Sequence, residues 1–281
     1  MEKGTLSNHL VAVEYSKNSL RITGFTPHGG SNLLVDLSAM KPVKTSYGEF
    51  HFQGGHRLWH APEAMPRTYV PDENGLDIQP VPNGVSLTTL HEPVTNIRKR
   101  MVLALDPLKA RLTIEHSLIN DGLWPVTLAP WAITQFRTGG KVLLPLHTGN
   151  SDAAGLLPNR QITLWPYTDT QDERLKVGNA AIAYHALPID KSFKIGSFTQ
   201  HGWMAYLLDG VLFKKSFSSE DDGLYPDQNC NAEIYGCADF VELESLGKMQ
   251  TLAPGETCSH QEVWEVEPDL HSLPTEIRKL L

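Results

Sequence analysis

The chain has few cysteines and no long apolar run. Among its 281 residues are 3 cysteines, Cys230, Cys237 and Cys258. A disulfide-held secreted protein would carry an even and denser set, so we interpret these as thiols, although Cys230 and Cys237 could pair locally or help to hold a metal. No stretch approaches the roughly 18 apolar residues of a membrane-spanning helix, and the N-terminal residues lack a signal peptide's apolar core. We therefore expect a cytoplasmic protein without a membrane partner.

Clusters of positive charge are also lacking. Lys and Arg together number 24 against 32 Asp and Glu, which gives a formal net charge of -8. The densest basic segment is Ile97 to Arg100, and such a short run is typical of the solvent face of a strand. Nucleic-acid binding needs a basic stripe that neutralises phosphates, so we expect no nucleic-acid partner.

Several motifs that would indicate a cofactor or a metal are missing. The glycine pairs Gly29-Gly30 and Gly139-Gly140 lack the strand-glycine-helix setting of a phosphate-binding loop, and there is no Gly-x-Ser-x-Gly elbow of a serine hydrolase. His51, His56 and His60 are spaced irregularly, without a helix or a cysteine pair beside them, which is unlike a zinc site. We expect neither a metal nor a cofactor.

Alternation of apolar and polar residues at a period of two dominates the chain, whereas helical periodicity is confined to a tail from about residue 274. Predicted strands run over Ser19–Phe25, Asn32–Leu37, Gly84–Leu90, Ile97–Leu105, Ala110–Ile119, Val126–Phe136, Gln161–Trp165, Ser192–Phe198, Met204–Phe213, Phe240–Leu246 and His260–Val266. Turn residues such as Asp121-Gly122 and Asp209-Gly210 punctuate these strands. The pattern predicts antiparallel sheets packed face to face in one all-β domain over residues 1–281.

Two segments combine many polar and aromatic side chains. Phe50–Glu63 (FHFQGGHRLWHAPE) places histidine, arginine and tryptophan around a glycine pair, and Phe240–Gly247 (FVELESLG) supplies carboxylates. A packing segment would be mostly aliphatic, whereas donors, acceptors and a flat aromatic face are what a polyhydroxylated ligand needs. We predict that both segments meet in one cleft.

The order of strands carries a family resemblance. Residues 98–105, 110–120 and 125–134 are expected to form a three-strand meander, and Phe240–Gly247 precedes a Pro254-Gly255 turn and a closing strand, HQEVWEV. This arrangement, with GGHRLW, resembles the galactose mutarotase-like (aldose 1-epimerase-like) superfamily, in an uncharacterised-domain branch. The resemblance implies a large antiparallel supersandwich and a small-molecule carbohydrate as the partner.

Mutarotation needs a base for the anomeric hydroxyl and an acid for the ring oxygen. The resemblance implies that Glu244 is the base. Glu242 lies two residues away on the same strand face, where mutual repulsion would raise the pKa of one carboxyl. Two solvent-facing glutamates on an outer strand are the plainer alternative.

The acid is harder to assign, because the family histidines are replaced by Gln53 and by the segment around Trp131. His56, His60 and His201 are the substitutes that the sequence offers, although histidines in loops often only cap or face solvent. The candidate catalytic residues are thus Glu244, Glu242, His56 and His201.

Ligand binding is assigned to polar and aromatic groups near these motifs. The planar fork of Arg57 suits sugar hydroxyls or a phosphate, but a salt bridge to Glu63 is the alternative. Trp59 and Trp131 offer faces for a pyranose or belong to the core. The candidate substrate-binding residues are Gln53, Arg57, Trp59, His60, Glu63, Trp131 and Asp190, the last by resemblance alone.

Three functions remain open from the sequence, because one fold hosts many activities. The first is an aldose 1-epimerase-like enzyme that acts on a free or phosphorylated sugar. The second is a non-catalytic carbohydrate-binding domain, which the missing histidines favour. The third is a polysaccharide-processing domain, which ranks last because the helical or barrel domains that accompany it are absent from this sequence.

Overall fold

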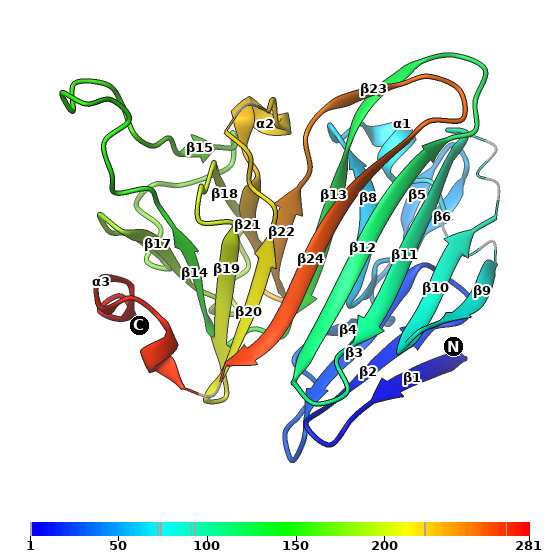
Figure 1. Cartoon of the computed structure of the whole chain (residues 1–281), viewed down its shortest axis with the longest axis horizontal. Helices are drawn as coiled ribbons and strands as arrows, with labels where there is room; N and C mark the ends of the chain where they lie inside the picture. Colours follow the sequence, from blue (N-terminus) through cyan, green and yellow to red (C-terminus); the bar gives the residue numbers. More distant parts are fainter. Residues whose placement is uncertain are drawn as a thin grey trace.

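The computed structural model describes residues 2–71, 73, 75–90, 92, 94–221, 223–267 and 269–281, with the side chain of residue 66 left aside. Within them, the strands form two ten-stranded antiparallel sheets and two short two-stranded ones. Figure 1 shows the large sheets facing each other, with long strands crossing the full height of the molecule. This architecture confirms the predicted all-β supersandwich.

The first sheet carries the predicted polar segments. Across the sheet its strands are β1 (Lys3–Ser7), β2 (Val11–Ser16), β3 (Arg21–Pro27), β8 (His56–Ala61), β13 (Val126–Phe136), β22 (Val241–Leu246), β21 (Ala232–Gly236), β18 (Phe193–Ser197) and β15 (Thr163–Leu164). A further strand, β23 (Gln250–Leu252), pairs with the beginning of β13. Strands β8, β13 and β22 thus lie side by side in the middle of this sheet.

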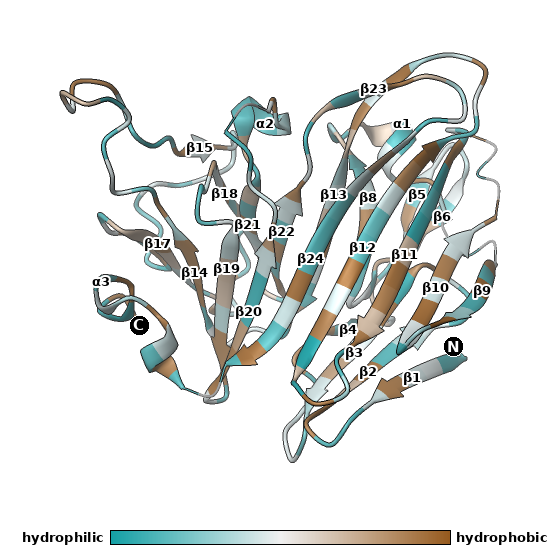
Figure 2. Cartoon of the chain, in the orientation of Figure 1, coloured by the Kyte–Doolittle hydropathy of each residue, from teal (hydrophilic) through white to brown (hydrophobic). Residues whose placement is uncertain are grey.

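The second sheet covers one face of the first. Across the sheet its strands are β16 (Leu175–Val177), β17 (Ala181–His185), β14 (Lys141–Pro145), β19 (Trp203–Leu208), β20 (Val211–Phe217), β24 (Thr257–Glu267), β12 (Arg111–Asn120), β11 (Ile97–Leu105), β10 (Gly84–Thr89) and β9 (Leu76–Val81). Figure 2 shows hydrophobic and hydrophilic residues alternating along β11 and β12, as expected for strands with one buried face.

The remaining elements are short. Strand β4 (Asp36–Leu37) pairs with β7 (Gln53–Gly54), and β5 (Val43–Thr45) pairs with β6 (Gly48–Phe50). The helices are α1 (Met65–Thr68), α2 (Pro226–Asn229), a 3-10 turn (Leu270–Ser272) and α3 (Thr275–Arg278). Helix α3 lies within the segment from about residue 274 where the sequence predicted a helical tail. Among the described residues, no helix has the length and apolar character needed to cross a bilayer.

The main hydrophobic core lies between the two large sheets. Phe25 of the first sheet meets Phe213 and Trp264 of the second edge-to-face, each at a ring-centroid distance of 5.6 Å. All three side chains are fully buried. Aromatic pairs of this geometry add about 0.5–1.5 kcal/mol beyond the burial of their area. The core therefore fixes the inner faces of both sheets and leaves the outer face of the first sheet for other contacts.

The predicted three-strand meander is wrong in its third strand. Strands β11 and β12 pair as expected, but β13 belongs to the other sheet, and β24 takes the place beside β12. The Asn120 side chain holds this crossing, because its Nδ2 donates to the carbonyls of Trp124 and Leu252 at 2.9 Å each. The chain therefore changes sheets at a turn that a sequence pattern cannot distinguish from a hairpin.

The predicted strand over 204–213 is also two strands. Asp209 and Gly210, named above as a turn, both have left-handed backbone angles (φ 52° and 79°), and they reverse the chain between β19 and β20. Alternation continues on both sides of the turn, so the hydrophobic pattern alone does not show the break.

A second hydrophobic cluster covers part of the outer face of the first sheet. It contains Phe50, Trp59, Trp131 and Leu246, with partly buried Tyr69 packed against them. Strands β8, β13 and β22 contribute to it, and β6 supplies Phe50. This cluster forms an apolar floor on the face that the second sheet leaves uncovered. Such a floor suits a binding site.

Candidate functional site

The two polar segments meet on the outer face of the first sheet. Arg57 on β8 is paired with Ile133 on β13, and Ile133 is paired with Glu244 on β22, so the three residues form one row across the sheet. Side chains in such a row point to the same face. The predicted convergence of GGHRLW and ELES on one surface is therefore present, although almost the whole chain separates the segments.

A glycine turn brings β8 into this row. Gly54 and Gly55 have left-handed angles (φ 81° and 72°), and a Cβ on either would lie 2.1 Å from a backbone oxygen, of Val35 and Ile22 respectively. Only glycine accepts both the angle and the contact. The pair therefore sets the start of β8 at His56, directly before Arg57.

A cavity of about 530 Å³ opens on this face. Its lining includes Phe52, Arg57, Trp59, Glu63, Tyr69, Trp131, Tyr167, Ser192, Lys194, Tyr235 and Glu242. The volume is within the range of small-molecule sites, and the mixture of aromatic walls with a few charged groups is typical of them.

Glu242 is a buried carboxyl in the wall of the cavity. Its Oε1 accepts hydrogen bonds from Arg57 Nη2 at 3.0 Å and from Gln135 Nε2 at 2.9 Å. Burial raises the pKa of Glu242 to about 7, Arg57 opposes that rise, and the negative charge of Glu244 adds to it. A carboxyl with this pKa exchanges protons readily near neutral pH.

Glu244 has the opposite character. Its Oε2 accepts hydrogen bonds from the Trp131 indole at 2.7 Å and from Lys194 Nζ at 3.0 Å. Burial disfavours the charged form, but the Lys194 cation and these hydrogen bonds outweigh it and lower the pKa of Glu244. Lys194 also contacts Glu233 Oε2 at 2.8 Å, and burial raises the pKa of Glu233.

The two carboxyls therefore differ, because the pKa of Glu242 is raised and that of Glu244 is lowered. The sequence predicted only that repulsion would raise the pKa of one of them. The titrating member is Glu242, which lines the cavity, whereas the Glu244 side chain is fully buried beside Trp131. The resemblance assigned the base to Glu244, whereas Glu242 is the member of the pair that lines the cavity.

Arg57 lies over the face of Trp59, with its Cζ 4.1 Å from the ring centroid. It pairs with Glu242 rather than with Glu63, the partner considered above. Trp59 and Trp131 contact each other edge-to-face at 5.4 Å, and both are almost fully buried. The two indoles therefore form the apolar floor of the cavity more than an open stacking platform.

The rim offers more accessible groups. Glu63 accepts a hydrogen bond from the Tyr69 hydroxyl at 2.6 Å, and both residues line the cavity. Tyr167 also lines it and remains 45% exposed. Burial raises the pKa of both tyrosines, so their hydroxyls stay protonated and can donate hydrogen bonds at neutral pH.

Two predicted binding residues face elsewhere. Gln53 bonds to Ser19 and Glu73 and lines a separate cavity with them. His60 lies between two outward-facing residues of β8, so it points to the other side of the sheet, where burial lowers its pKa. Neither residue lines the cavity that holds Glu242.

Two more candidates lie away from the cavity. His201 lines a groove together with Ile277 and Leu280 of the C-terminal segment. Asp190 is exposed in the loop between β17 and β18. The structure does not bring either of them to Glu242.

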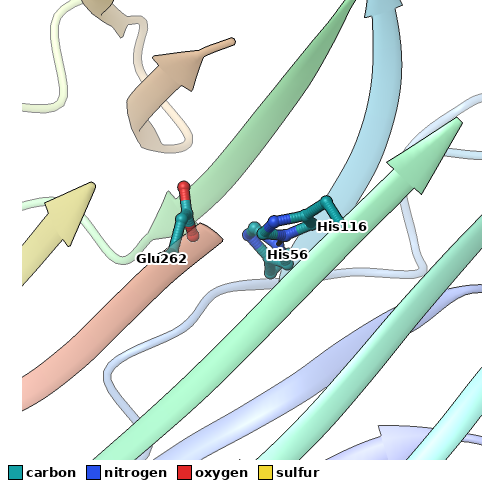
Figure 3. Close-up of side chains that lie close together, drawn as sticks. All are labelled: His56, His116 and Glu262. Carbon is teal, nitrogen blue, oxygen red and sulfur yellow. Dashed lines mark hydrogen bonds between the residues drawn. The ribbon is translucent and has the colours of Figure 1, made fainter. Parts of the chain in front are cut away.

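His56 is buried in the core between the sheets. Its Nδ1 lies 2.9 Å from Thr134 Oγ1, and its Nε2 lies 2.8 Å from His116 Nε2. Figure 3 shows the two histidine rings close to Glu262. His116 Nδ1 must donate to the His260 carbonyl at 3.0 Å, so its Nε2 accepts from His56. His56 Nδ1 then accepts from Thr134. This hydrogen-bond network assigns both tautomers.

The same rings and Glu262 offer ligand atoms within 4.8 Å of one another, which raises the question of a metal. Lys215 Nζ contacts Glu262 Oε1 at 2.7 Å and supplies the balancing positive charge. The facing ring nitrogens are already joined by a hydrogen bond. The donor set therefore serves a buried polar network better than it serves a cation.

Sequence reasoning missed Lys194, Tyr69, Tyr167 and Tyr235 in the cavity wall. Lys194 lies in a predicted strand, where its charge at an otherwise apolar stretch was the available signal. Tyr167 follows Trp165-Pro166, and two aromatic residues around a proline in a loop can indicate a binding rim. The tyrosines at 69 and 235 carried no local signal.

The fold has many counterparts among solved structures. A galactose mutarotase-like protein from Lactobacillus casei ATCC 334 superposes with a TM-score of 0.64 at 11% identity, over 95% of this chain and 100% of that one. A galactose mutarotase related enzyme from Lactobacillus acidophilus gives 0.61 at 8% identity, over 98% and 99%. No family model and no curated protein matches the sequence. At these identities the likeness is one of fold, and it confirms the resemblance at that level.

Proposed function

We propose that the chain is a carbohydrate-active protein, most simply an aldose 1-epimerase-like enzyme that interconverts the anomers of a sugar. One observation carries this proposal. Glu242, a carboxyl whose pKa is raised to about 7, is held by Arg57 and Gln135 in a cavity with aromatic walls. A positioned group of this pKa is what proton transfer at neutral pH requires.

In this proposal Glu242 takes the proton of the anomeric hydroxyl. Arg57 and Gln135 both contact Oε1 and so fix the orientation of the carboxyl. Glu244 remains ionised beside Lys194, and its negative charge helps to keep the pKa of Glu242 high. It acts through Glu242 and is a positioning residue.

The ring oxygen needs a proton from a second group. The Tyr69 hydroxyl and Glu63 share a hydrogen bond on the wall of the same cavity, and we assign the second proton transfer to this pair. It takes the part that a histidine has in the resembled enzymes, since no histidine occurs among the described residues that line the cavity.

The charges favour an uncharged sugar over a phosphorylated one. Arg57 is already paired with the Glu242 carboxylate. Lys194 is paired with two glutamates. A phosphate in this cavity would compete with carboxylates for both cations.

The second candidate is a non-catalytic carbohydrate-binding domain. The observation in its favour is that Gln53 and Trp131 stand where the family has histidines, and Gln53 faces another cavity. Loss of a catalytic group removes chemistry while a binding cavity can persist.

Exchange between α- and β-anomers, followed by NMR or optical rotation, decides between these functions. The panel contains glucose, galactose and their 6-phosphates. We expect accelerated exchange of at least one neutral hexose. No acceleration together with a sugar-dependent rise in melting temperature would instead establish the binding domain. Neither effect with any sugar would overturn both.

A further inference from the structure

A second cavity adjoins the one that holds Glu242. It has a volume of about 400 Å³, and Glu63, Tyr69 and Lys194 line both cavities. Its other walls include Trp165 and Asp227. Because three side chains are common to both cavities, a ligand in the first would extend past the Tyr69–Glu63 pair to reach the second.

Trp165 gives the second cavity an anchored aromatic wall. Lys194 Nζ lies 4.8 Å from the centroid of this ring, and also 4.8 Å from that of Trp131 in the first cavity. The turn after Trp165 is tied to β18, because Thr168 Oγ1 donates to the carbonyl of Lys194. A fixed, partly exposed indole such as that of Trp165 suits the apolar face of a sugar ring.

The charge of the second cavity is unfavourable for an anion. Among the described residues that line it, the cation is Lys194, and Lys194 is bonded to Glu233 and Glu244, which are outside this lining. Glu63 and Asp227 add two carboxyls to the lining itself. Carboxyls accept hydrogen bonds from hydroxyls but repel phosphate or uronate groups.

Asp227 is also held in an unusual backbone conformation. It begins three consecutive residues with left-handed angles, Asp227, Gln228 and Asn229 (φ 50°, 60° and 71°). Such angles are unfavourable in residues other than glycine, and strain of this kind concentrates at binding sites. The surrounding contacts keep it in place, since Gln161 Nε2 donates to the carbonyls of Gln228 and Asn229.

We infer that the second cavity binds a second, neutral sugar ring, so that the substrate is a reducing disaccharide or a longer neutral glycan rather than a lone hexose. This inference rests on the proposed function of the first cavity. The first ring lies beside Glu242, and the next one lies against Trp165, with its hydroxyls near Asp227 and Glu63.

The test compares Kd values for glucose and galactose with those for maltose, cellobiose and lactose, measured by ligand-observed NMR on the full chain. We expect at least one disaccharide to bind about tenfold more tightly than its constituent hexoses. In Trp165→Ala the ratio of the hexose Kd to the disaccharide Kd should fall about fivefold or more, as expected for the loss of one aromatic contact. Trp124→Ala is the matched control, since Trp124 is 79% exposed and lines neither cavity.

A second variant tests the charge argument. Asp227→Asn keeps the shape of the side chain, and asparagine tolerates left-handed angles. Wild-type protein should bind glucose 6-phosphate more weakly than maltose, and this difference should narrow in Asp227→Asn. If glucose 6-phosphate binds as well as the best disaccharide, a phosphate occupies the second cavity and the inference is wrong.

The failure of this inference is distinguishable from failure of the proposed function. If hexoses bind or exchange anomers but no disaccharide binds more tightly than its hexoses, the inference of a second sugar ring is wrong and the proposed function stands. An equal loss of affinity for hexose and disaccharide in Trp165→Ala would also contradict the second ring alone. Absence of binding by all of these sugars would overturn the sugar site as a whole.

Discussion

Arg57 Nη2 donates to Glu242 Oε1 at 3.0 Å, although 185 positions separate the two residues in the sequence. Both side chains are almost fully buried, so the pair is little screened by solvent. The contact joins the two segments that the sequence singled out and places a carboxyl of raised pKa inside the cavity. The first predictions concern this carboxyl.

Replacing Glu242 by Gln should remove most anomer exchange. Glutamine keeps the shape and can still accept from Arg57, but it cannot take a proton. Loss of a positioned general base costs on the order of 100- to 10,000-fold. Wild-type exchange should also rise with pH through about 7, as Glu242 loses its proton. Rates by NMR across this range test both points, and an unchanged rate in Glu242→Gln would contradict the assignment.

Replacing Glu244 by Gln should shift the pH profile rather than abolish exchange. The negative charge of Glu244 helps to raise the pKa of Glu242, so its removal should lower that pKa and move the rising limb to lower pH. Circular dichroism serves as the folding control, because Lys194 loses one partner. If Glu244→Gln loses as much activity as Glu242→Gln at every pH, Glu244 is the base, as the family resemblance implies.

Tyr167→Ala should weaken sugar binding without unfolding the protein. Tyr167 is 45% exposed at the cavity and can be truncated without leaving a void in the core. Loss of one aromatic contact of about 1 kcal/mol raises Kd roughly fivefold. Titration of intrinsic fluorescence with the best-bound sugar measures the effect. An unchanged Kd would remove Tyr167 from the site.

Glu262→Gln should destabilise the protein far more than Glu14→Gln. Glu262 pairs with Lys215 where both are fully buried, whereas Glu14 pairs with Lys3 where both are about 40% exposed. Breaking a buried pair costs roughly 3–5 kcal/mol, and an exposed pair contributes about 0–1 kcal/mol. Urea unfolding of both variants gives the two values. Similar losses would contradict the prediction.

Acid should unfold the protein through its buried histidines. Burial lowers the pKa of His116 and of His260 to about 3, below the value of about 6.5 in an unfolded chain. Their contribution to stability is therefore complete above about pH 6.5 and is lost as pH falls toward 3, with a slope of up to about 1.4 kcal/mol per pH unit for each. Denaturant midpoints between pH 7 and 4 test this. His116→Gln should flatten the slope, and an unchanged slope would contradict it.

The sequence predicted the fold more completely than it predicted the site. The predicted strand 126–136 has the bounds of β13, because alternation over one buried face is a local signal. The partner of β13 was mispredicted, since pairing depends on contacts between distant segments. Sheet order is therefore where the sequence pattern failed.

Within the site, spacing placed Glu242 and Glu244 on one face but could not show which of them meets the cavity. That difference arises from Lys194 and Trp131, which come from other strands and bond to Glu244 but not to Glu242. The sequence prediction for His56 likewise did not take account of the sheet face that this residue occupies. It precedes Arg57 directly, and neighbouring residues of a strand point to opposite faces, so His56 joins the core.

The buried Lys215–Glu262 contact restricts how strand β24 can align with its neighbours. A slip of β24 by one residue would turn Glu262 to the opposite face of the sheet, and Lys215 would be left in the core without its counter-charge. A hydrophobic core of similar shape would tolerate such a slip more readily, because one aliphatic side chain can replace another. The ion pair thus selects one alignment of an 11-residue strand against both of its neighbours.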